Sequence, residues 1–404
     1  MTFEFTKTRE MIPELPDVYF LGQNHFGQFK KSIKDEKFYE KIDWSQFSEN
    51  PFSNILNFDI AVTVNYSAIA VDSKLFISTI DLKENVISDE KPLLTKTFSF
   101  DSLISKVSAN TSYCLILLEN GDLFQIMIGT FEKRQISCLN VEVTPEKKSI
   151  FVENRNSVRN LEKIVDIACG ETVCVAVTNL NAVYNIPNLT FNFPKHTKIR
   201  KICCGNEHSM ILTANGDVFT WGTGLRGQLG HGEIQNEEVP KLVEGLAGLK
   251  VVDISAGGWS SAAITSFGDL YMWGWNSHGQ LGFRVFDVSS PSTQNPSKNQ
   301  TVYTIPTLVS LDDEESDEPS LEISCKKVFC GSKHTLVLTE DGKLFVTGSN
   351  VYKQLGLEEN FKPNSLKKDQ FLDNFTELQP KLPKNVKNYK ISCAYSCTLF
   401  IENK

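Results

Sequence analysis

The chain has 404 residues, 41% of them hydrophobic, and carries a formal net charge of −8. This composition is sufficient for a large core, and the acidic balance argues against a general nucleic-acid-binding protein, which presents a basic face to phosphates. No stretch contains the roughly 18 consecutive apolar residues of a membrane span, and residues 1–15 lack the apolar region of a secretory signal peptide. The sequence therefore predicts a protein of the nucleus or cytosol with no membrane segment.

Apolar runs that alternate with turn signals recur along the chain, and each pair of runs predicts a β-hairpin. In the clearest unit, Ser209–Thr213 and Val218–Trp221 flank Asn215-Gly216, a dipeptide that favours the positive φ angles of a tight turn. Two weaker units replace the turn glycine, with Asp72-Ser73 and with Asn181. In chain order, the predicted units are residues 60–77, 107–124, 164–184, 202–221, 254–273 and 328–346.

The chain begins with half a unit at residues 18–29 and ends with the complementary half at residues 391–401. We expect the two halves to share one sheet, which brings the number of units to seven. A ring of four-stranded sheets leaves only short edges open, whereas an open solenoid needs distinct polar caps. The sequence therefore predicts an all-β fold: a seven-bladed β-propeller of four-stranded antiparallel blades, forming a single domain over residues 1–404 with blades at about 18–401.

Two insertions interrupt the repeats. Residues 132–161 are charged with mixed sign, and residues 284–320 are rich in Ser, Pro, Asn and Gln and end in the acidic run 312–318. Neither has a core-forming period, so we expect mobile loops. The acidic run either contacts a basic partner such as histone tails or only keeps its loop solvated.

The most informative motif is an aromatic-Gly pair followed by Gly-Gln-Leu-Gly. Residues 221–230 read WGTGLRGQLG and residues 273–282 read WGWNSHGQLG, with fainter copies at 21–29 and 347–356. These motifs resemble those of the regulator-of-chromosome-condensation repeat family, whose fold is a seven-bladed β-propeller. The resemblance spans about residues 18–401 and is strongest in residues 199–283.

Within that family, residues 227–232, 240–246, 256–260 and 268–276 are most similar to short members made of one propeller. This similarity implies a monomeric, non-enzymatic scaffold of the nucleus and chromosome, with a cytoplasmic pool left open. The implied partner is a Jumonji-type oxygenase, a histone demethylase, with histones or chromatin as further partners in chromatin regulation or chromosome segregation. Direct nucleic-acid binding is not expected.

Two other functions remain open. The first is guanine-nucleotide exchange on a small GTPase, the founding activity of the family, which the acidic balance and the lack of a basic N-terminal tail argue against. The second is a photoreceptor like the plant ultraviolet sensor, a family that repeats Gly-Trp-Arg-His-Thr. Here Gly258-Trp259 is followed by Ser260-Ser261, so the tryptophan cluster of that sensor is missing.

No catalytic, cofactor or metal site is predicted. His208 and His334 occupy matching repeat positions, which favours a role in the fold over one in acid–base chemistry. Nucleophile-elbow, zinc-protease and phosphate-loop motifs are all missing from the sequence. The ten cysteines include no Cys-x-x-Cys pair, and we expect free, buried thiols.

The candidate partner-binding residues are Trp259, Trp275 and Arg226. We expect both tryptophans to lie near blade edges on one face of the propeller, with Arg226 in the corresponding turn of the preceding blade. Trp and Arg are enriched in interface hot spots, but tryptophans also pack between blades, and the sequence leaves both roles open.

Overall fold

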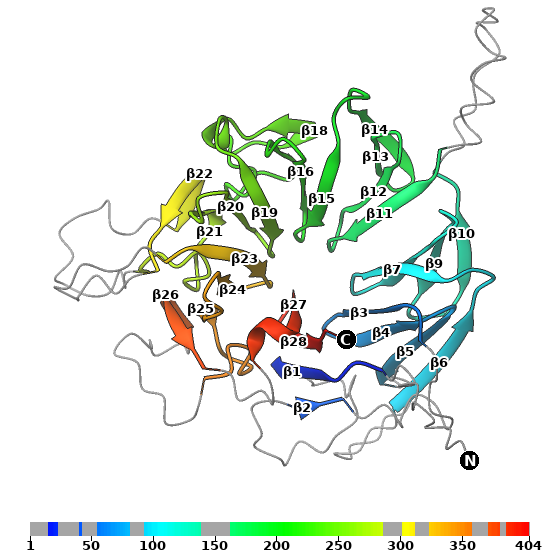
Figure 1. The fold of residues 1–404 in the computed structure, drawn as a ribbon. Helices are drawn as coiled ribbons and strands as arrows, with labels where there is room; N and C mark the ends of the chain where they lie inside the picture. The colour runs from blue at the N-terminus through cyan, green and yellow to red at the C-terminus, as the bar shows by residue number, and fades with distance from the viewer. Residues whose placement is uncertain are drawn as a thin grey trace, which may run out of the picture.

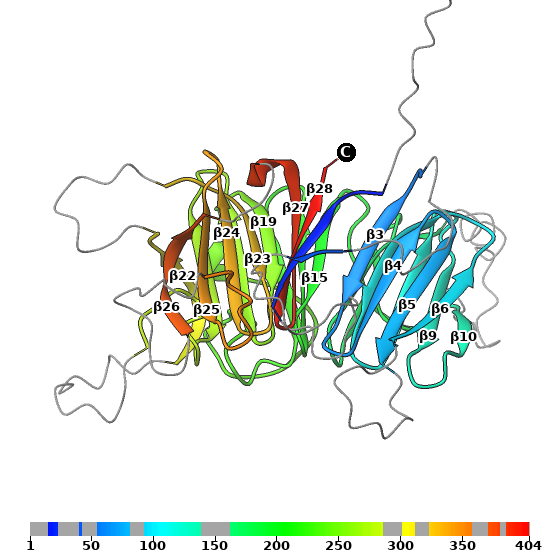
Figure 2. The same cartoon turned by 90° about the horizontal axis from the view of Figure 1, so that it is seen from below.

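The computed structural model describes residues 15–22, 40–42, 55–80, 93–138, 162–285, 301–311, 323–357, 371–379 and 385–403. These residues form seven four-stranded antiparallel sheets arranged as blades in a ring (Figure 1). The innermost strands and the turns that follow them line a central channel. Seen from the side, the strands run roughly from one face of the ring to the other (Figure 2). The predicted seven-bladed β-propeller is confirmed.

Each blade is numbered in chain order, and its strands are given from the channel outward. Blades 1 to 3 contain β3 (Phe58–Val62), β4 (Tyr66–Val71), β5 (Lys74–Ile80) and β6 (Leu93–Ser99); β7 (Ile104–Ala109), β8 (Tyr113–Leu118), β9 (Leu123–Met127) and β10 (Lys133–Ile136); and β11 (Ile164–Cys169), β12 (Cys174–Thr178), β13 (Ala182–Asn185) and β14 (Asn188–Asn192). Blades 4 to 6 contain β15 (Ile199–Cys204), β16 (His208–Thr213), β17 (Val218–Gly222) and β18 (Glu237–Leu242); β19 (Val251–Ala256), β20 (Ser260–Thr265), β21 (Leu270–Trp275) and β22 (Val302–Val309); and β23 (Cys325–Cys330), β24 (His334–Thr339), β25 (Leu344–Ser349) and β26 (Phe371–Leu378). Two short 3₁₀ helices, η2 (Glu244–Leu246) and η4 (Val386–Asn388), lie between strands.

Blade 7 combines strands from the two ends of the sequence. Its inner strands are β27 (Tyr389–Ala394) and β28 (Cys397–Glu402), followed outward by β1 (Val18–Gly22) and β2 (Glu40–Lys41). β1 pairs antiparallel with β28 over its full length, with Val18 opposite Ile401 and Gly22 opposite Cys397. Backbone hydrogen bonds therefore join the first described segment to the last.

The predicted bounds of the two mobile insertions, residues 132–161 and 284–320, were wrong, because each range contains a β-strand. Lys133–Ile136 forms β10 within residues 132–161, and Val302–Val309 forms β22 within residues 284–320. Both are outermost strands that leave most of their side chains exposed or half-buried. β10 reads KRQI and β22 contains a proline, so neither has the buried apolar run of the second strand of each blade. Residues 139–161, 286–300 and 312–322, including the acidic run, lie outside the described residues.

The core is divided among the contacts between neighbouring blades. Seven clusters of buried hydrophobic side chains each join two adjacent blades. Trp221 packs with Val175 and Val177 between blades 3 and 4, and Trp273 packs with Met210 between blades 4 and 5. Because each blade buries both of its faces against neighbours, the core is complete only when the ring is closed.

The Gly-Gln-Leu-Gly motif supplies a hydrogen bond between blades that we call the Gln latch. The backbone carbonyl of Gln228 accepts hydrogen bonds from Ser261 Oγ at 2.8 Å and from Trp273 Nε1 at 3.0 Å, both in the next blade. At the following two boundaries, Gln280 and Gln354 use their carbonyls in the same way. Their donors are Thr335 Oγ1 at 2.7 Å and Thr398 Oγ1 at 3.2 Å.

The two repeated histidines support this latch. His208 Nε2 lies 2.9 Å from Ser261 Oγ, and His334 Nε2 lies 3.2 Å from Thr398 Oγ1. Both imidazoles are fully buried, and burial lowers the pKa of His208 to about 3 and that of His334 to about 4. The rings are therefore neutral at pH 7 and serve the fold.

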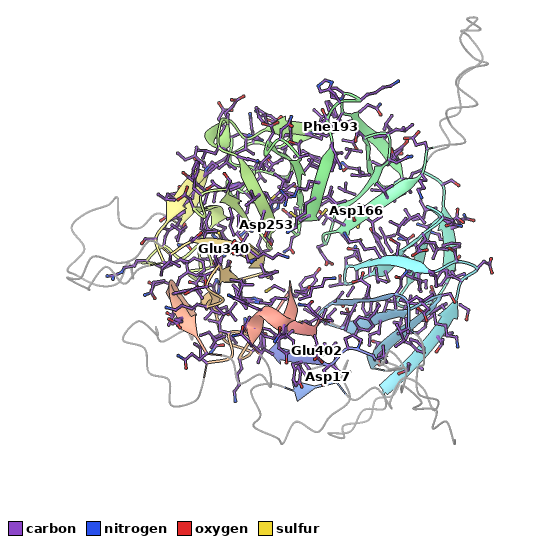
Figure 3. The ribbon with its side chains drawn as sticks, viewed as in Figure 1. Asp17, Asp166, Phe193, Asp253, Glu340 and Glu402 are labelled. Atoms are coloured by element: carbon purple, nitrogen blue, oxygen red, sulfur yellow. The ribbon has the colours of Figure 1, made fainter. Side chains whose placement is uncertain are left out.

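Charges of alternating sign follow one another on the inner strands. Equivalent positions in blades 1 to 7 are Asp59, Lys106, Asp166, Lys201, Asp253, Lys327 and Lys390. Three pairs join neighbouring blades: Lys106–Asp166 at 2.5 Å, Lys201–Asp253 at 2.8 Å and Lys390–Asp59 at 3.6 Å. Asp166 and Asp253 lie near the inner rim of the ring (Figure 3). Because seven is odd, alternation cannot close, and Lys327 has no ion-pair partner within the described ranges.

Deleting residues 386–404 should open the ring, because the deletion removes β27 and β28 and exposes the edge of β1. We expect an aggregation-prone protein without a cooperative thermal transition, measured by light scattering and calorimetry against the full chain. Cooperative melting of the truncated protein at the full-length temperature would contradict this account.

Replacing Gly222 or Gly274 with Val should destabilise the fold by about 2–4 kcal/mol, through backbone strain and overpacking. Gly222 has φ +109° and Gly274 has φ +103°; a Cβ would meet the Glu207 carbonyl oxygen at 2.6 Å and the Trp259 carbonyl oxygen at 2.4 Å, respectively. Gly129, where a Cβ meets nothing within 4 Å, is the matched control. Equal losses at all three sites in denaturant unfolding would contradict the prediction.

Acidification should destabilise the ring through His208 and His334. Their folded pKa values lie below the value of about 6.5 in an unfolded chain, so the unfolded state binds more protons below that pH. The stabilisation from neutral imidazoles is present above pH 6.5 and is lost as pH falls toward 4, by about 3 kcal/mol per histidine. Denaturant unfolding between pH 7 and pH 4 measures the loss, and the His208→Gln variant should show a flatter dependence. An unchanged slope in that variant would exclude the histidine contribution.

Candidate protein-interaction site

The three predicted partner-binding residues meet at the boundary between blades 4 and 5. Arg226 lies in the turn after β17, Trp259 lies in the turn between β19 and β20, and Trp275 ends β21. The two turns belong to different blades but lie at the same end of their strands, so the packing of the blades brings the side chains together.

The cluster combines a cation with two aromatic rings. The guanidinium carbon of Arg226 lies 4.3 Å from the ring centroid of Trp259 and 4.2 Å from that of Trp275. The two indoles meet edge to face, with centroids 5.5 Å apart and an interplanar angle of 78°. Cation–π contacts of this kind contribute about 0.5–2 kcal/mol each, depending on desolvation. We call these residues the Arg226–Trp259–Trp275 cluster.

Backbone hydrogen bonds fix the positions of these side chains. Gln228 Oε1 accepts from the Arg226 backbone N–H at 2.8 Å, so the residue that forms the Gln latch also shapes the Arg226 turn. The Trp275 N–H donates to the Trp259 carbonyl at 2.8 Å, and the positive φ of Gly274 permits this close approach. The cluster is therefore attached to the contact that joins the two blades.

The cluster differs from the core tryptophans in its exposure and in its free donors. Trp221 and Trp273 are 1% and 0% exposed, whereas Arg226, Trp259 and Trp275 are all half-buried. Within the described residues the Arg226 guanidinium makes no hydrogen bond or ion pair, and Trp259 Nε1 is buried without a hydrogen-bond partner. The Arg226 guanidinium can thus offer N–H donors to a carboxylate or carbonyl, with apolar ring surface of the two indoles beside it.

The same position in the next two blades carries residues that were not selected from the sequence. His278 and Tyr352 occupy the place of Arg226, and their backbone N–H groups donate to Gln280 and Gln354 side chains at 2.8 Å. His278 Nε2 lies 3.5 Å from Lys333 Nζ, in the turn that matches the one carrying Trp259. Alignment of the Gly-Gln-Leu-Gly copies was the signal that could have found them.

A second feature is a cavity of about 220 Å³ in the central channel, lined by the inner strands and the turns that follow them. No group of three or more His, Cys, Asp or Glu side chains in the described residues could hold a metal ion. All ten cysteines are free thiols. No helix in the ranges that the structure describes is long and apolar enough to cross a membrane.

Known proteins share the repeats. Models of the regulator of chromosome condensation (RCC1) repeat match residues 215–264 and 268–338, and a second model of the same repeat matches residues 199–228, 251–280 and 325–354. Human RCC1 domain-containing protein 1 is 33% identical over 206 residues, which cover 45% of this chain and 52% of that protein. The ultraviolet-B receptor UVR8 of Arabidopsis thaliana is 27% identical over 237 residues, 51% of each chain. The chain spans about half the length of the curated relatives it matches.

Solved structures share the whole ring. Prp20p from Saccharomyces cerevisiae superposes with a TM-score of 0.64 at 14% identity, covering 97% of this chain and 92% of that one. Human WBSCR16 superposes with a TM-score of 0.62 at 16% identity, covering 96% and 100%. At these identities the likeness concerns the fold alone. The chain is thus a seven-bladed β-propeller that carries regulator of chromosome condensation repeats in residues 199–354.

Proposed function

We propose that this propeller is a non-enzymatic protein-interaction scaffold and that the Arg226–Trp259–Trp275 cluster binds its principal partner. The observation that carries the proposal is the half-buried guanidinium of Arg226, which two indoles hold in place while its N–H donors stay unused within the described residues. Aromatic and arginine side chains that are already ordered lose little conformational entropy on binding, and they dominate interface hot spots.

The partner proposed is a Jumonji-type oxygenase, a histone demethylase, that the propeller positions in the nucleus on chromatin. This part of the proposal depends on the resemblance of residues 227–276 to the short, single-propeller members of the repeat family, together with the 33% identity to human RCC1 domain-containing protein 1. The acidic net charge of −8 favours contact with basic histones over contact with DNA.

The alternative is nucleotide exchange on a small GTPase. Its support is the fold likeness to Prp20p, whose solved structure is described together with its binding to Gsp1p and histones. Affinity purification of the full-length chain followed by mass spectrometry separates the two functions. Recovery of a Jumonji oxygenase supports the scaffold, whereas recovery of a GTPase that loses affinity for the propeller on addition of nucleotide supports exchange.

Replacing Arg226 with Ala should weaken the complex with the principal partner about thirtyfold, the effect of losing a hot-spot contact of about 2 kcal/mol. The free energy of unfolding should fall by about 1 kcal/mol or less, since only half-buried cation–π contacts are lost. Titration calorimetry and thermal melts on the same variant measure both quantities. An unchanged affinity would remove Arg226 from the binding site.

Trp259→Ala and Trp275→Ala should give comparable losses of affinity. The matched control is Phe267→Ala, because Phe267 is 80% exposed and lies just after the last residue of β20, whereas Trp259 lies just before the first. A strand of six residues spans about 20 Å, so this control tests an exposed aromatic residue of the same blade on the other face. An equal loss of affinity in Phe267→Ala, or a large fall in melting temperature in the Trp variants, would contradict the proposed surface.

A further inference from the structure

The inner hairpins of the blades place two residues directly opposite each other at the base of the turn that joins the first two strands, and the first residue of each pair lines the channel cavity. In blades 1 to 7 these pairs are Val62–Ser67, Ala109–Cys114, Cys169–Cys174, Cys204–Ser209, Ala256–Ser261, Cys330–Thr335 and Cys393–Thr398. Blade 3 is the one blade in which both residues are cysteines. The repeat thus provides a set of matched sites that differ in chemistry.

Side chains at these paired positions touch. Cys204 Sγ lies 3.5 Å from Ser209 Oγ, and Cys330 and Cys393 Sγ lie 3.9 Å and 3.8 Å from the threonine hydroxyls opposite them. In blade 3 Cys169 stands directly opposite Cys174 in the ladder, and the Tyr113 hydroxyl lies 3.2 Å from Cys174 Sγ.

The backbone at this pair is also suited to a covalent bond. Gly170 N donates to Val173 O at 2.7 Å, so the adjoining pair 169–174 is a non-hydrogen-bonded pair of the ladder. Cα atoms of such pairs are about 4.5 Å apart, which lies within the range of roughly 4.4–6.8 Å found across disulfides. The two sulfurs can therefore reach bonding distance with little movement of the main chain.

The environment distinguishes the two thiols. The neighbouring Cys169 thiol, together with the Tyr113 hydroxyl 3.2 Å from Cys174 Sγ, lowers the pKa of Cys174 against the effect of burial. Burial raises the pKa of Cys169 and of the other eight thiols. Cys174 is therefore the thiol best able to react as a thiolate, and Cys169 is placed to attack the product.

We propose that Cys169, which lines the central channel, and the buried Cys174 directly opposite it form a peroxide-responsive dithiol. The Cys174 thiolate attacks one oxygen of hydrogen peroxide, the O–O bond breaks, and the products are a sulfenic acid and hydroxide. The Cys169 sulfur then attacks the Cys174 sulfur, water leaves, and a disulfide remains. Overall, two thiols and one peroxide give one disulfide and two waters. Cys169 lines the channel cavity, which is large enough to admit peroxide.

The disulfide would lie at the base of a turn that braces the ring. Glu171, between the two cysteines, accepts hydrogen bonds from the Thr111 hydroxyl of blade 2 and from the Tyr395 hydroxyl of blade 7. Asn110 Nδ2 also donates to the Glu171 carbonyl at 3.3 Å. Oxidation would restrict this turn and hence the contact that its carboxylate makes with Tyr395.

Peptide mapping of the reduced, full-length protein tests the proposal. The protein is treated with hydrogen peroxide, denatured, alkylated with N-ethylmaleimide and digested with trypsin; residues 164–195 form one tryptic peptide that contains only Cys169 and Cys174. We expect this peptide to lose both adducts together, in a change that dithiothreitol reverses, while the other eight cysteines keep theirs. If Cys169 and Cys174 keep both adducts at doses that oxidise the other cysteines, the proposal is wrong.

Two variants test the assigned roles. In Cys169→Ser, a sulfenic acid should persist at Cys174 and be trapped by dimedone. In Cys174→Ser, Cys169 should stay reduced at the same dose. Oxidation of Cys169 at the wild-type rate in the second variant, or a Cys174–Cys204 disulfide in the wild-type chain, would overturn the assignment; thermal melts confirm that both variants are folded.

Discussion

The hydrogen bond from a Ser or Thr hydroxyl to the Gln carbonyl of the preceding blade is the contact on which this molecule depends. It repeats from Gln228–Ser261 to Gln354–Thr398, and it sets the spacing of blades 4 to 7 while hydrophobic side chains fill the space between them. Each such bond contributes only about 1 kcal/mol, but an unpaired buried carbonyl costs more than the bond itself contributes. The latch therefore selects one packing of the blades and gives the hydrophobic contacts their register.

The sequence predicts the inner part of each blade well because the second strand of each blade is buried on both faces and is followed by a turn with a strong signal. Asn181, where the template has glycine, adopts φ 67°, which Asn tolerates better than most residues. Outer strands such as β10 and β22 could not be predicted, since edge strands have little apolar pattern and their pairing is set by the neighbouring strand. The repeat alignment placed Arg226 in a turn that corresponds to that of Trp275 and predicted both tryptophans near one face. The contact among the three side chains and their half-burial depend on packing between blades that no local pattern encodes.

The residues proposed here for binding and for thiol chemistry lie where the chain departs from its own repeat. Trp259 stands where the equivalent turns carry Glu207 and Lys333, and Cys174 stands where the strong repeats carry Ser or Thr. A residue that breaks a repeated pattern is not required by the fold, and such departures are expected at functional sites. The Gln latch thus holds neighbouring blades together. The turns carry the Arg226–Trp259–Trp275 cluster at one face of the ring and the Cys169–Cys174 pair at the base of a turn beside the channel.

Hydrogen–deuterium exchange on the complex with the partner recovered by affinity purification tests whether the Arg226–Trp259–Trp275 cluster is the binding surface. The method maps the contact surface without altering the protein. On binding, exchange should slow in residues 223–230, 257–260 and 275–278, the segments that carry the Arg226–Trp259–Trp275 cluster. Exchange should change little in residues 265–269, at the opposite end of the same blade. Protection of residues 265–269 with unchanged exchange in the other three segments would contradict the account.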